Sequence, residues 1–171
     1  MRTSLNASYV RSILDYEEET GLFRWRYRAD RRRNWNTRYA GAVAGCRRDD
    51  DYITIVIDAK VFYAHRLAWL WMTGEWPLIE IDHWDTCHDN NRWKNLRLAT
   101  GAQNKRNVKR RRSNASGVIG VSYYPPTNRW RARIKVDGRE IALGYFRTKA
   151  EAATARYTAT KELHGEFGRA A

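Results

Sequence analysis

The stretch IDHWDTCHDNNRWKNLRLATGAQN, from Ile81 to Asn104, concentrates acids, imidazoles and amides in a chain that is otherwise basic. It holds two histidines, three aspartates and four asparagines. Turn chemistry alone can explain such a loop, but a metal-dependent active site has a sharper need for the same side chains. Hydrolysis of a phosphodiester requires a base near pH 7, which histidine supplies, and a cation held by oxygen ligands. Asp82 and His83 are adjacent, so on a strand their side chains point in different directions, one toward a metal and one toward water.

Composition limits the kinds of partner that this chain can have. Its 171 residues suit one domain or two small ones, and 43% hydrophobic residues are enough for a folded core. A net charge of +13 indicates a polyanionic partner, with nucleic acid the leading candidate. We expect no membrane span and no signal peptide, because no apolar run is long enough. Cys46 and Cys87 lie far apart and form no CxxC pair, so we expect both to be reduced in a cytoplasmic protein.

Local patterns in the N-terminal region predict one helix and a pair of strands. The spacing of Val10 and Ile13 predicts a helix that Asn6 or Ser8 caps. Apolar residues on both sides of a turn at Thr20–Gly21 indicate strands. The arginine-rich stretch RADRRRNWNTRYAGAVAG is expected to be a surface loop, either solvated or in contact with phosphates.

The middle of the chain predicts a hairpin, a helix, the polar stretch and a further helix. YITIVI and VFYA are expected to pair as strands, and HRLAWLWMTG to form a helix that Gly74 ends. NLRLATGAQNKRN is expected to form a helix, or a turn and a helix, that returns Asn104 toward Asp82. Outside the Asp-His pair, we expect His88 to be a solvent-facing turn residue and His65 a packing or capping residue. Trp84 and Trp93 are expected to be packing anchors.

The C-terminal region predicts three antiparallel strands followed by one helix. RWRARIKVDG alternates, so apolar side chains share one face and basic ones the other. The helix TKAEAATARYTATKELHG begins with Thr148 as cap and Glu151 at the capping-box position. The basic run KRNVKRRRS before this region reads as a linker between domains that would bind phosphates.

The polar stretch resembles the HNH endonucleases, in the branch of phage and intron-encoded homing enzymes. The matching residues are Asp82-His83, Asn91-Arg92, Asn95-Leu96-Arg97 and Gln103-Asn104. The resemblance implies a ββα-metal core in which His83 is the general base and Asn95 orients the histidine or braces the fold. It also implies that Asp82 and Asn104 bind a divalent metal, Mg²⁺ or alternatively Mn²⁺. Thr86 departs from the family pattern, which usually has glycine in this turn, and Thr tolerates a positive φ poorly.

The C-terminal region resembles an AP2 domain of the kind fused to phage HNH nucleases. The residues that carry this resemblance are Gly117, Gly120-Val121, Trp130, Ala132, Leu143-Gly144, Phe146, Thr148, the helix alanines Ala152, Ala153 and Ala155, and His164-Gly165-Glu166-Phe167. The resemblance implies that the three-stranded sheet enters the major groove of DNA. In one departure, a tyrosine usual in the helix comes one place late as Tyr157, after Arg156.

These observations predict an α+β protein with an HNH domain and N-terminal extension at 1–104, a basic linker at 105–113 and an AP2-like domain at 114–171. The residues expected to contact DNA are Arg97, Lys105, Arg106, Lys109, Arg110, Arg111, Arg112, Tyr123, Arg129, Arg131, Arg133 and Lys135. The predicted activity is hydrolysis of phosphodiester bonds in double-stranded DNA, as a nick or a double-strand break. The resemblance to the HNH endonucleases implies that the products carry a 3′ hydroxyl and a 5′ phosphate.

Two alternatives stay open at this stage, a catalytically silent, sequence-specific DNA-binding protein and an RNA-directed enzyme. For the endonuclease we expect a monomer that needs no small-molecule cofactor beyond the metal. If a phage encodes it, the protein is expected in the cytoplasm of a bacterial host.

Overall fold

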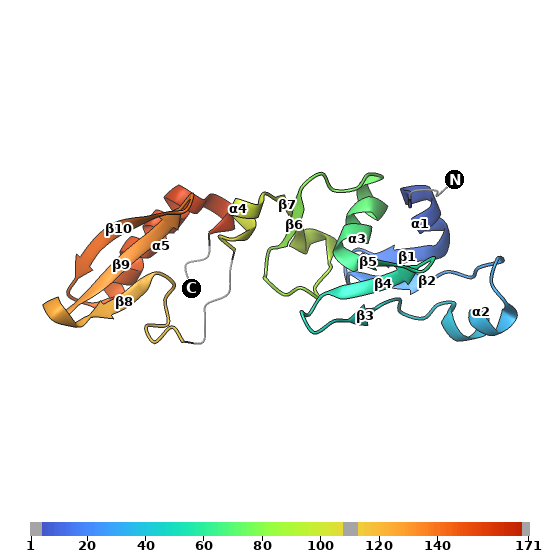
Figure 1. Ribbon diagram of the computed structural model, residues 1–171, viewed down its shortest axis with the longest axis horizontal. Helices are drawn as coiled ribbons and strands as arrows, with labels where there is room; N and C mark the ends of the chain where they lie inside the picture. Colours follow the sequence, from blue (N-terminus) through green and yellow to red (C-terminus); the bar gives the residue numbers. More distant parts are fainter. Residues whose placement is uncertain (1–4, 108–112, 169–171) are drawn as a thin grey trace. The chain divides into compact units, whose positions relative to one another are not determined.

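The computed structural model describes residues 5–107 and 113–168 and divides the chain into two compact units, Met1–Ala99 and Thr100–Ala171. Both units combine short helices with small antiparallel sheets (Figure 1), which confirms the predicted α+β class. The elements of the first unit are α1 (Ala7–Ile13), β1 (Leu14–Glu17), β2 (Leu22–Trp25), α2 (Arg33–Tyr39), β3 (Cys46–Arg47), β4 (Ile53–Ile57), β5 (Lys60–Tyr63), α3 (Ala64–Thr73), β6 (Glu80–His83), the 3-10 helix η1 (Trp93–Asn95) and β7 (Leu96–Ala99).

Local sequence signals account for several of these elements. Asn6 caps α1 by accepting a hydrogen bond from the Tyr9 amide, and Gly74 ends α3 in the left-handed conformation, as predicted. The predicted hairpin forms as β4 and β5, and β3 pairs with β4 to complete a three-stranded sheet. Val10 of α1 and Leu67 of α3 are fully buried in the core of this unit, so α1 and α3 pack together through their apolar faces.

Two predictions of local structure are wrong. The arginine-rich stretch is not all loop, because Arg33–Tyr39 forms the helix α2. The ring of Trp35 packs on Trp25 of β2, a tertiary contact that favours a helix where the local sequence shows no apolar period long enough to predict one. Leu96–Ala99 is the strand β7 instead of part of a helix, since its backbone pairs with β6.

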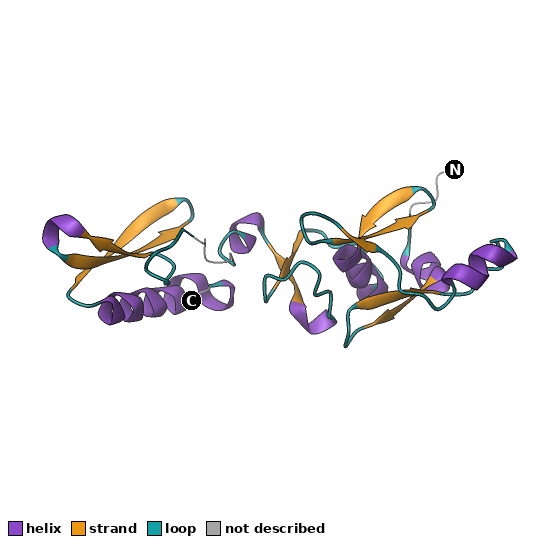
Figure 2. Ribbon diagram, turned by 90° about the horizontal axis from the view of Figure 1, so that it is seen from below, coloured by secondary structure: helices purple, strands orange, loops and turns teal. Residues whose placement is uncertain are grey.

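The second unit is a three-stranded sheet and a helix. Its elements are α4 (Gly101–Asn104), β8 (Val121–Tyr124), η2 (Pro125–Thr127), β9 (Arg129–Val136), β10 (Arg139–Phe146), α5 (Lys149–His164) and η3 (Gly165–Phe167). The strand order is β10-β9-β8, and Figure 2 shows α5 along one face of this sheet. The predicted capping box of Thr148 and Glu151 is present at the start of α5. Val121, Ala132 and Ala152 form a small core between the sheet and the helix.

The division into units places Asn104 at the start of the second unit, after the boundary between Ala99 and Thr100. The predicted division at 1–104, 105–113 and 114–171 stays a prediction, and residues 108–112 of the predicted linker lie outside the described residues. Within the part of the chain that the structure describes, no helix combines the length and the apolar character that crossing a membrane requires.

Candidate active site

The hairpin of β6 and β7 positions the Asp-His pair. Asp82 pairs with Arg97 and His83 with Leu96 across the two strands. Because neighbouring residues on a strand point to opposite faces, the carboxylate and the imidazole leave the backbone in different directions. Both side chains are nevertheless deeply buried, with exposed fractions of 4% for Asp82 and 2% for His83. The loop between the strands and the rest of the first unit therefore enclose the site.

Arg97 neutralises the buried carboxylate of Asp82. Arg97 donates from Nε and Nη2 to the same carboxylate oxygen, Oδ2, at 2.9 and 2.8 Å. A buried carboxylate is costly without an opposite charge, and this cross-strand ion pair places the guanidinium of Arg97 beside Asp82. The sequence predicted that Arg97 contacts DNA, but the structure engages its guanidinium with Asp82.

The environment of His83 favours the neutral imidazole. Burial lowers the pKa of His83, and His88 lowers it further. Asn91 and the carboxylates of Asp85 and Asp82 act in the opposite direction but do not outweigh burial. A neutral imidazole near pH 7 can accept a proton, as a general base must.

Asn91 determines which nitrogen of His83 carries the proton. His83 Nε2 lies 3.2 Å from Asn91 Oδ1, while Asn91 Nδ2 is directed at the carbonyl of Asp89 at 3.4 Å. With its amide in this orientation, Asn91 accepts a hydrogen bond from Nε2–H. The basic lone pair of neutral His83 is then on Nδ1. Asn91 stood in the sequence motif without a role, and only this contact assigns one.

The N-terminal hairpin, formed by β1, β2 and the turn between them, contacts the backbone of Asn91 and fixes its position. The hydroxyl of Tyr16 donates to the Asn91 carbonyl at 2.6 Å in a buried contact, and burial raises the pKa of Tyr16 so that it stays a donor. Gly21, at φ +75°, approaches so closely that an added Cβ would lie 2.4 Å from the Asn91 carbonyl carbon and from the Arg92 nitrogen. The amide of Trp93 also donates to the Glu18 carbonyl at 3.0 Å. A segment about seventy residues earlier in the chain thus positions the residue that holds His83.

Asn95 braces the loop between β6 and β7. Its Oδ1 accepts from the Asp85 amide at 3.0 Å, and its Nδ2 donates to Asp85 Oδ1 at 3.0 Å and to the Asn90 carbonyl at 2.8 Å. Of the two roles expected for Asn95, these three hydrogen bonds support the bracing one.

Aromatic rings surround the imidazole of His83. His65 meets it edge to face with ring centroids 5.2 Å apart, and Tyr52 lies 5.8 Å from it. Burial lowers the pKa of His65 to about 3, so His65 is neutral and packs as expected. His88 lies in a turn, as expected, but it is only partly solvent-facing: its ring is half-buried, stacks on Tyr52 at 4.2 Å and lies 5.8 Å from His83. Nothing in the local sequence around Tyr52 marked it as a neighbour of the site.

The turn that follows His83 contains a non-glycine residue in the left-handed region. Thr86 has φ +63°, and its amide donates to the His83 carbonyl at 2.8 Å. The sequence predicted difficulty at this position, and the structure accepts the strained backbone there. Trp84, in the same turn, is 62% exposed and is not the packing anchor that the sequence predicted. Trp93 does pack, with its ring 5.1 Å from Trp69.

The two residues predicted to bind the metal, Asp82 and Asn104, carry oxygen donors that suit a hard divalent cation. The carboxyl group of Asp82 is buried, and the guanidinium of Arg97 lies beside it in an ion pair. A carboxylate and an amide oxygen are the ligands that Mg²⁺ accepts while it retains several waters. The second predicted ligand, Asn104, is the last residue of α4, which a Thr100–Gln103 capping box starts. No cluster of three His, Cys, Asp or Glu side chains suited to a metal occurs among the described residues, and the predicted pair does not require one.

The second unit presents a basic sheet face, and the strand register places one residue of the predicted set, Tyr123, on the other face. Arg131 pairs with Ser122 and Tyr145, so these side chains share a face opposite Trp130 and Ala132. The residues of β9 on this face are Arg129, Arg131, Arg133 and Lys135. Tyr123 pairs with Trp130 and therefore lies on the other face, whereas Tyr124 pairs with Arg129 and lies beside the arginines. The register of the strands, not their composition, decides this difference.

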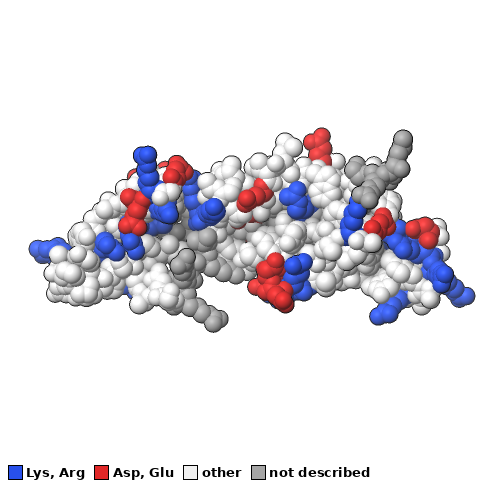
Figure 3. Space-filling view, in the orientation of Figure 1, with Lys and Arg blue, Asp and Glu red and all other residues white. Residues whose placement is uncertain are grey.

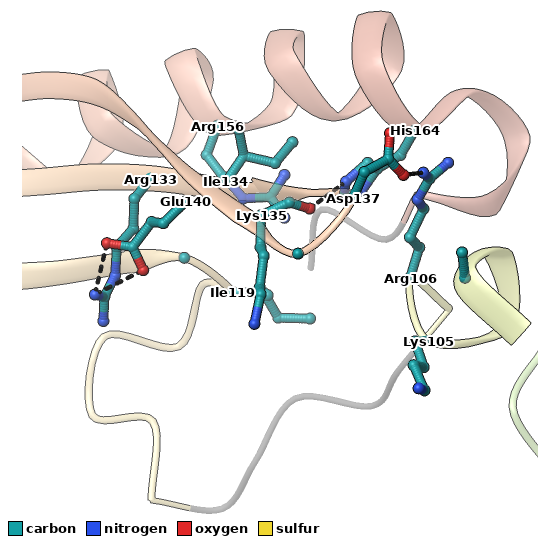
Figure 4. Close-up of a pocket in the computed structure, with 13 residues that line it drawn as sticks. Lys105, Arg106, Ile119, Arg133, Ile134, Lys135, Asp137, Glu140, Arg156 and His164 are labelled. Atoms are coloured by element: carbon teal, nitrogen blue, oxygen red, sulfur yellow. Dashed lines mark hydrogen bonds and ion pairs between the residues drawn. The ribbon is translucent and has the colours of Figure 1, made fainter.

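Several of the basic side chains of this unit already have partners. Figure 4 shows Arg133 directed at the carboxylate of Glu140, with Nη1 3.0 Å from Oε2, and Arg106 paired with Asp137 at 2.6 Å. Lys105 is exposed, and Lys109, Arg110, Arg111 and Arg112 lie outside the described residues. Exposed ion pairs of this kind are weak enough for a phosphate to displace them.

The comparisons with known proteins agree with the geometry. A family model described as HNH endonuclease matches residues 62–106, a range that contains Asp82, His83, Asn95 and Asn104. The chain therefore carries an HNH endonuclease domain at residues 62–106, and this match supports a nuclease that acts on DNA. It is also 32% identical over 117 residues to Protein 3.8 of Escherichia phage T7, an alignment that covers 64% of this chain and 94% of that protein. The chain belongs to the same family as this phage protein, and no solved structure matches it.

Proposed function

We propose that this protein is a metal-dependent endonuclease that hydrolyses phosphodiester bonds in double-stranded DNA. The observation that carries the proposal is the environment of His83, a buried neutral imidazole that Asn91 orients and that follows the Arg97-paired Asp82 in the chain. General base catalysis needs a group whose basic form predominates near neutral pH and whose lone pair has a fixed direction. Membership of the HNH family supports DNA as the substrate.

His83 acts on the water that attacks the phosphorus. Its Nδ1 takes a proton as the new phosphorus–oxygen bond forms, and the bond from phosphorus to the 3′ oxygen breaks. The 3′ oxygen leaves as a hydroxyl after it gains a proton from solvent, and the phosphate stays on the 5′ side. Asn91 keeps the Nε2 proton in place throughout, because its carbonyl oxygen accepts that hydrogen bond.

Asp82 and Asn104 would hold the cation, which when bound stabilises negative charge on the leaving oxygen and the phosphate. Arg97 forms an ion pair with Asp82 and fixes the direction of its carboxylate. Once a cation supplies the positive charge beside Asp82, the guanidinium of Arg97 can turn to a phosphate oxygen, which would reconcile its ion pair with its predicted contact to DNA.

The second unit would direct the nuclease to its DNA. The basic face of β9 supports this role, since the major groove accepts a sheet and arginine can bind guanine through two hydrogen bonds. Tyr124 replaces Tyr123 as the aromatic residue of this surface, because Tyr124 is on the arginine face. Lys105, Arg106 and the basic residues 109–112 would add contacts to phosphates.

Cleavage of supercoiled plasmid tests the hydrolytic role. Wild-type protein with Mg²⁺ is expected to convert the plasmid to nicked or linear DNA, and a chelator is expected to stop the reaction. His83→Ala should bind DNA as wild type does and lose cleavage. Leu78→Ala, a change at an almost fully exposed position of the first unit away from the proposed binding residues, serves as the matched folding and activity control. If the folded wild type binds DNA and never cleaves it under any divalent metal, the alternative of a catalytically silent DNA-binding protein is correct.

A further inference from the structure

The helix α2 presents three arginines that no carboxylate neutralises. Arg32, Arg33 and Arg38 are exposed, and no ion pair involves them in the part of the chain that the structure describes. The acids nearby are already engaged, because Asp30 and Asp58 pair with Arg28 and Arg31. Figure 3 shows basic side chains gathered over α2, at the right of the view. The helix thus carries a local excess of positive charge.

The side of α2 opposite this surface is anchored to the rest of the first unit, so the surface has a fixed orientation on that unit. Trp35 meets Trp25 of β2 edge to face at 5.6 Å and contacts Tyr39 at 5.1 Å. Asn36 is buried and makes two hydrogen bonds to the backbone of Arg28, at 2.8 Å from its amide and 2.7 Å to its carbonyl. Aromatic packing and buried amide hydrogen bonds therefore hold the helix in one orientation.

The outward face of α2 is polar throughout. A shallow hollow on it is lined by Arg33, Asn34, Thr37 and Arg38, which lie on one side of the helix at the spacing of one turn. Arginines with neighbouring amide and hydroxyl groups are the side chains that contact phosphate oxygens of nucleic acid. Insertion into a membrane would need large apolar side chains on this face, and Trp35 and Tyr39 face inward instead.

We propose that the surface formed by Arg32, Arg33 and Arg38 binds the phosphate backbone of the duplex DNA on which the first unit acts. It is a contact in addition to those predicted for the second unit, and it would hold the duplex independently of its sequence. This inference rests on the proposed function for the identity of the nucleic acid. The charges that the anchored helix keeps together repel one another, and a polyanion relieves that repulsion.

The salt dependence of binding tests this surface. The full chain in the presence of a chelator, which prevents cleavage, is titrated with a short duplex of mixed sequence at several salt concentrations. Arg32→Gln combined with Arg33→Gln and Arg38→Gln is expected to weaken binding and to reduce the slope of log affinity against log salt by about 2 to 3, since each phosphate contact contributes about 0.9. The loss should be the same for duplexes of different sequence.

A charge-matched control separates a local contact from net charge. The control variant combines Arg147→Gln with Lys149→Gln and Lys161→Gln, which removes the same amount of positive charge. Arg147 lies just before α5, and Lys149 and Lys161 are exposed residues of α5, which covers the face of the sheet opposite the β9 arginines. This control is expected to leave the slope nearly unchanged. Equal slopes in the two triple variants would overturn the proposal. It would also be overturned if the α2 variant bound anionic vesicles more weakly than wild type but bound duplex DNA equally well.

The outcome is separable from that of the proposed hydrolysis. A reduced slope in a protein that never cleaves DNA supports the surface and refutes the catalytic role. Cleavage by wild type together with an unchanged slope in the α2 variant supports the catalytic role and refutes the surface. Wild-type protein that does not bind duplex DNA at all refutes both.

Discussion

Gly21 lies where the N-terminal hairpin touches the loop that holds His83, and Gly21→Ala probes that contact. Two separate penalties follow from the geometry. The backbone at φ +75° is in the left-handed region, where a residue with a Cβ lowers the stability of the folded state by roughly 1–2 kcal/mol. A Cβ there would also lie 2.4 Å from backbone atoms of Asn91 and Arg92, and overpacking of this kind costs about 1–3 kcal/mol.

Gly41→Ala is the matched control for the first penalty. Gly41 has a similar φ of +80° and lies in the same unit, but no atom is within 4 Å of its added Cβ. Alanine also reduces the conformational entropy of the unfolded chain, which stabilises the folded state by about 0.4–1 kcal/mol at either position. The free energy of unfolding should therefore fall by about 0.5–1 kcal/mol for Gly41→Ala. For Gly21→Ala it should fall by about 2–4 kcal/mol, because the steric contact is added.

Urea unfolding followed by tryptophan fluorescence measures the difference. Seven of the eight tryptophans belong to the first unit and only Trp130 to the second, so the signal reports on the unit that is changed. At a common m-value the midpoint gives the loss of stability directly. If the two alanine variants lose the same stability, the hairpin does not press on Asn91 and the account of how His83 is positioned is wrong. A folded Gly21→Ala protein should also cleave more slowly, because the displaced Asn91 no longer orients His83.

Three further predictions concern the surroundings of the site. His65 has a pKa of about 3 in the folded protein against 6.5 in the unfolded chain, so the stability that neutral His65 contributes is complete above pH 6.5 and is lost as the pH falls toward 3. The free energy of unfolding should therefore be about 2 kcal/mol lower at pH 5 than at pH 7. Urea titrations at the two pH values measure this difference, and His65→Phe should reduce it. Asn95→Ala removes three hydrogen bonds that brace the loop, one of them to the carboxylate of Asp85, and should lower the free energy of unfolding by about 2–4 kcal/mol; a loss under about 0.5 kcal/mol would contradict the bracing role. Burial lowers the pKa of His83, so the rate of cleavage with saturating metal should decline only below pH 6.5, and a decline centred above pH 7 would argue against His83 as the base.

Much of the fold was predictable because the signals for it are local. The capping box at Thr148, the cap at Asn6 and the glycine end of α3 depend on a few consecutive residues whose hydrogen bonds close within one turn. The alternation in β9 likewise follows from the period of a strand. The spacing of the acidic, imidazole and amide residues from Asp82 to Asn104 was enough to suggest the class of nuclease, which the family match supports.

The misread elements share a physical cause. Arg33–Tyr39 is a helix because the ring of Trp35 packs against that of Trp25. Leu96–Ala99 is a strand because β6 supplies the hydrogen-bond partners of its backbone. Both conformations are stabilised by groups distant in the chain, and local propensity is too weak to decide against them. The same holds for Tyr123 and Tyr124, since only the pairing register says which of two adjacent tyrosines joins the arginines.

The chain's residue order thus carried the chemistry of the site: which side chains are available, and that Asp82 and His83 leave a strand in different directions. Folding in three dimensions added how those side chains are controlled. Arg97 pairs with Asp82 through strand register, and Asn91 holds His83 because Tyr16 and Gly21 hold Asn91. Such contacts join residues tens of positions apart, and hydrogen bonds and steric contacts act over a few ångströms, so they exist only once the chain has brought those residues together.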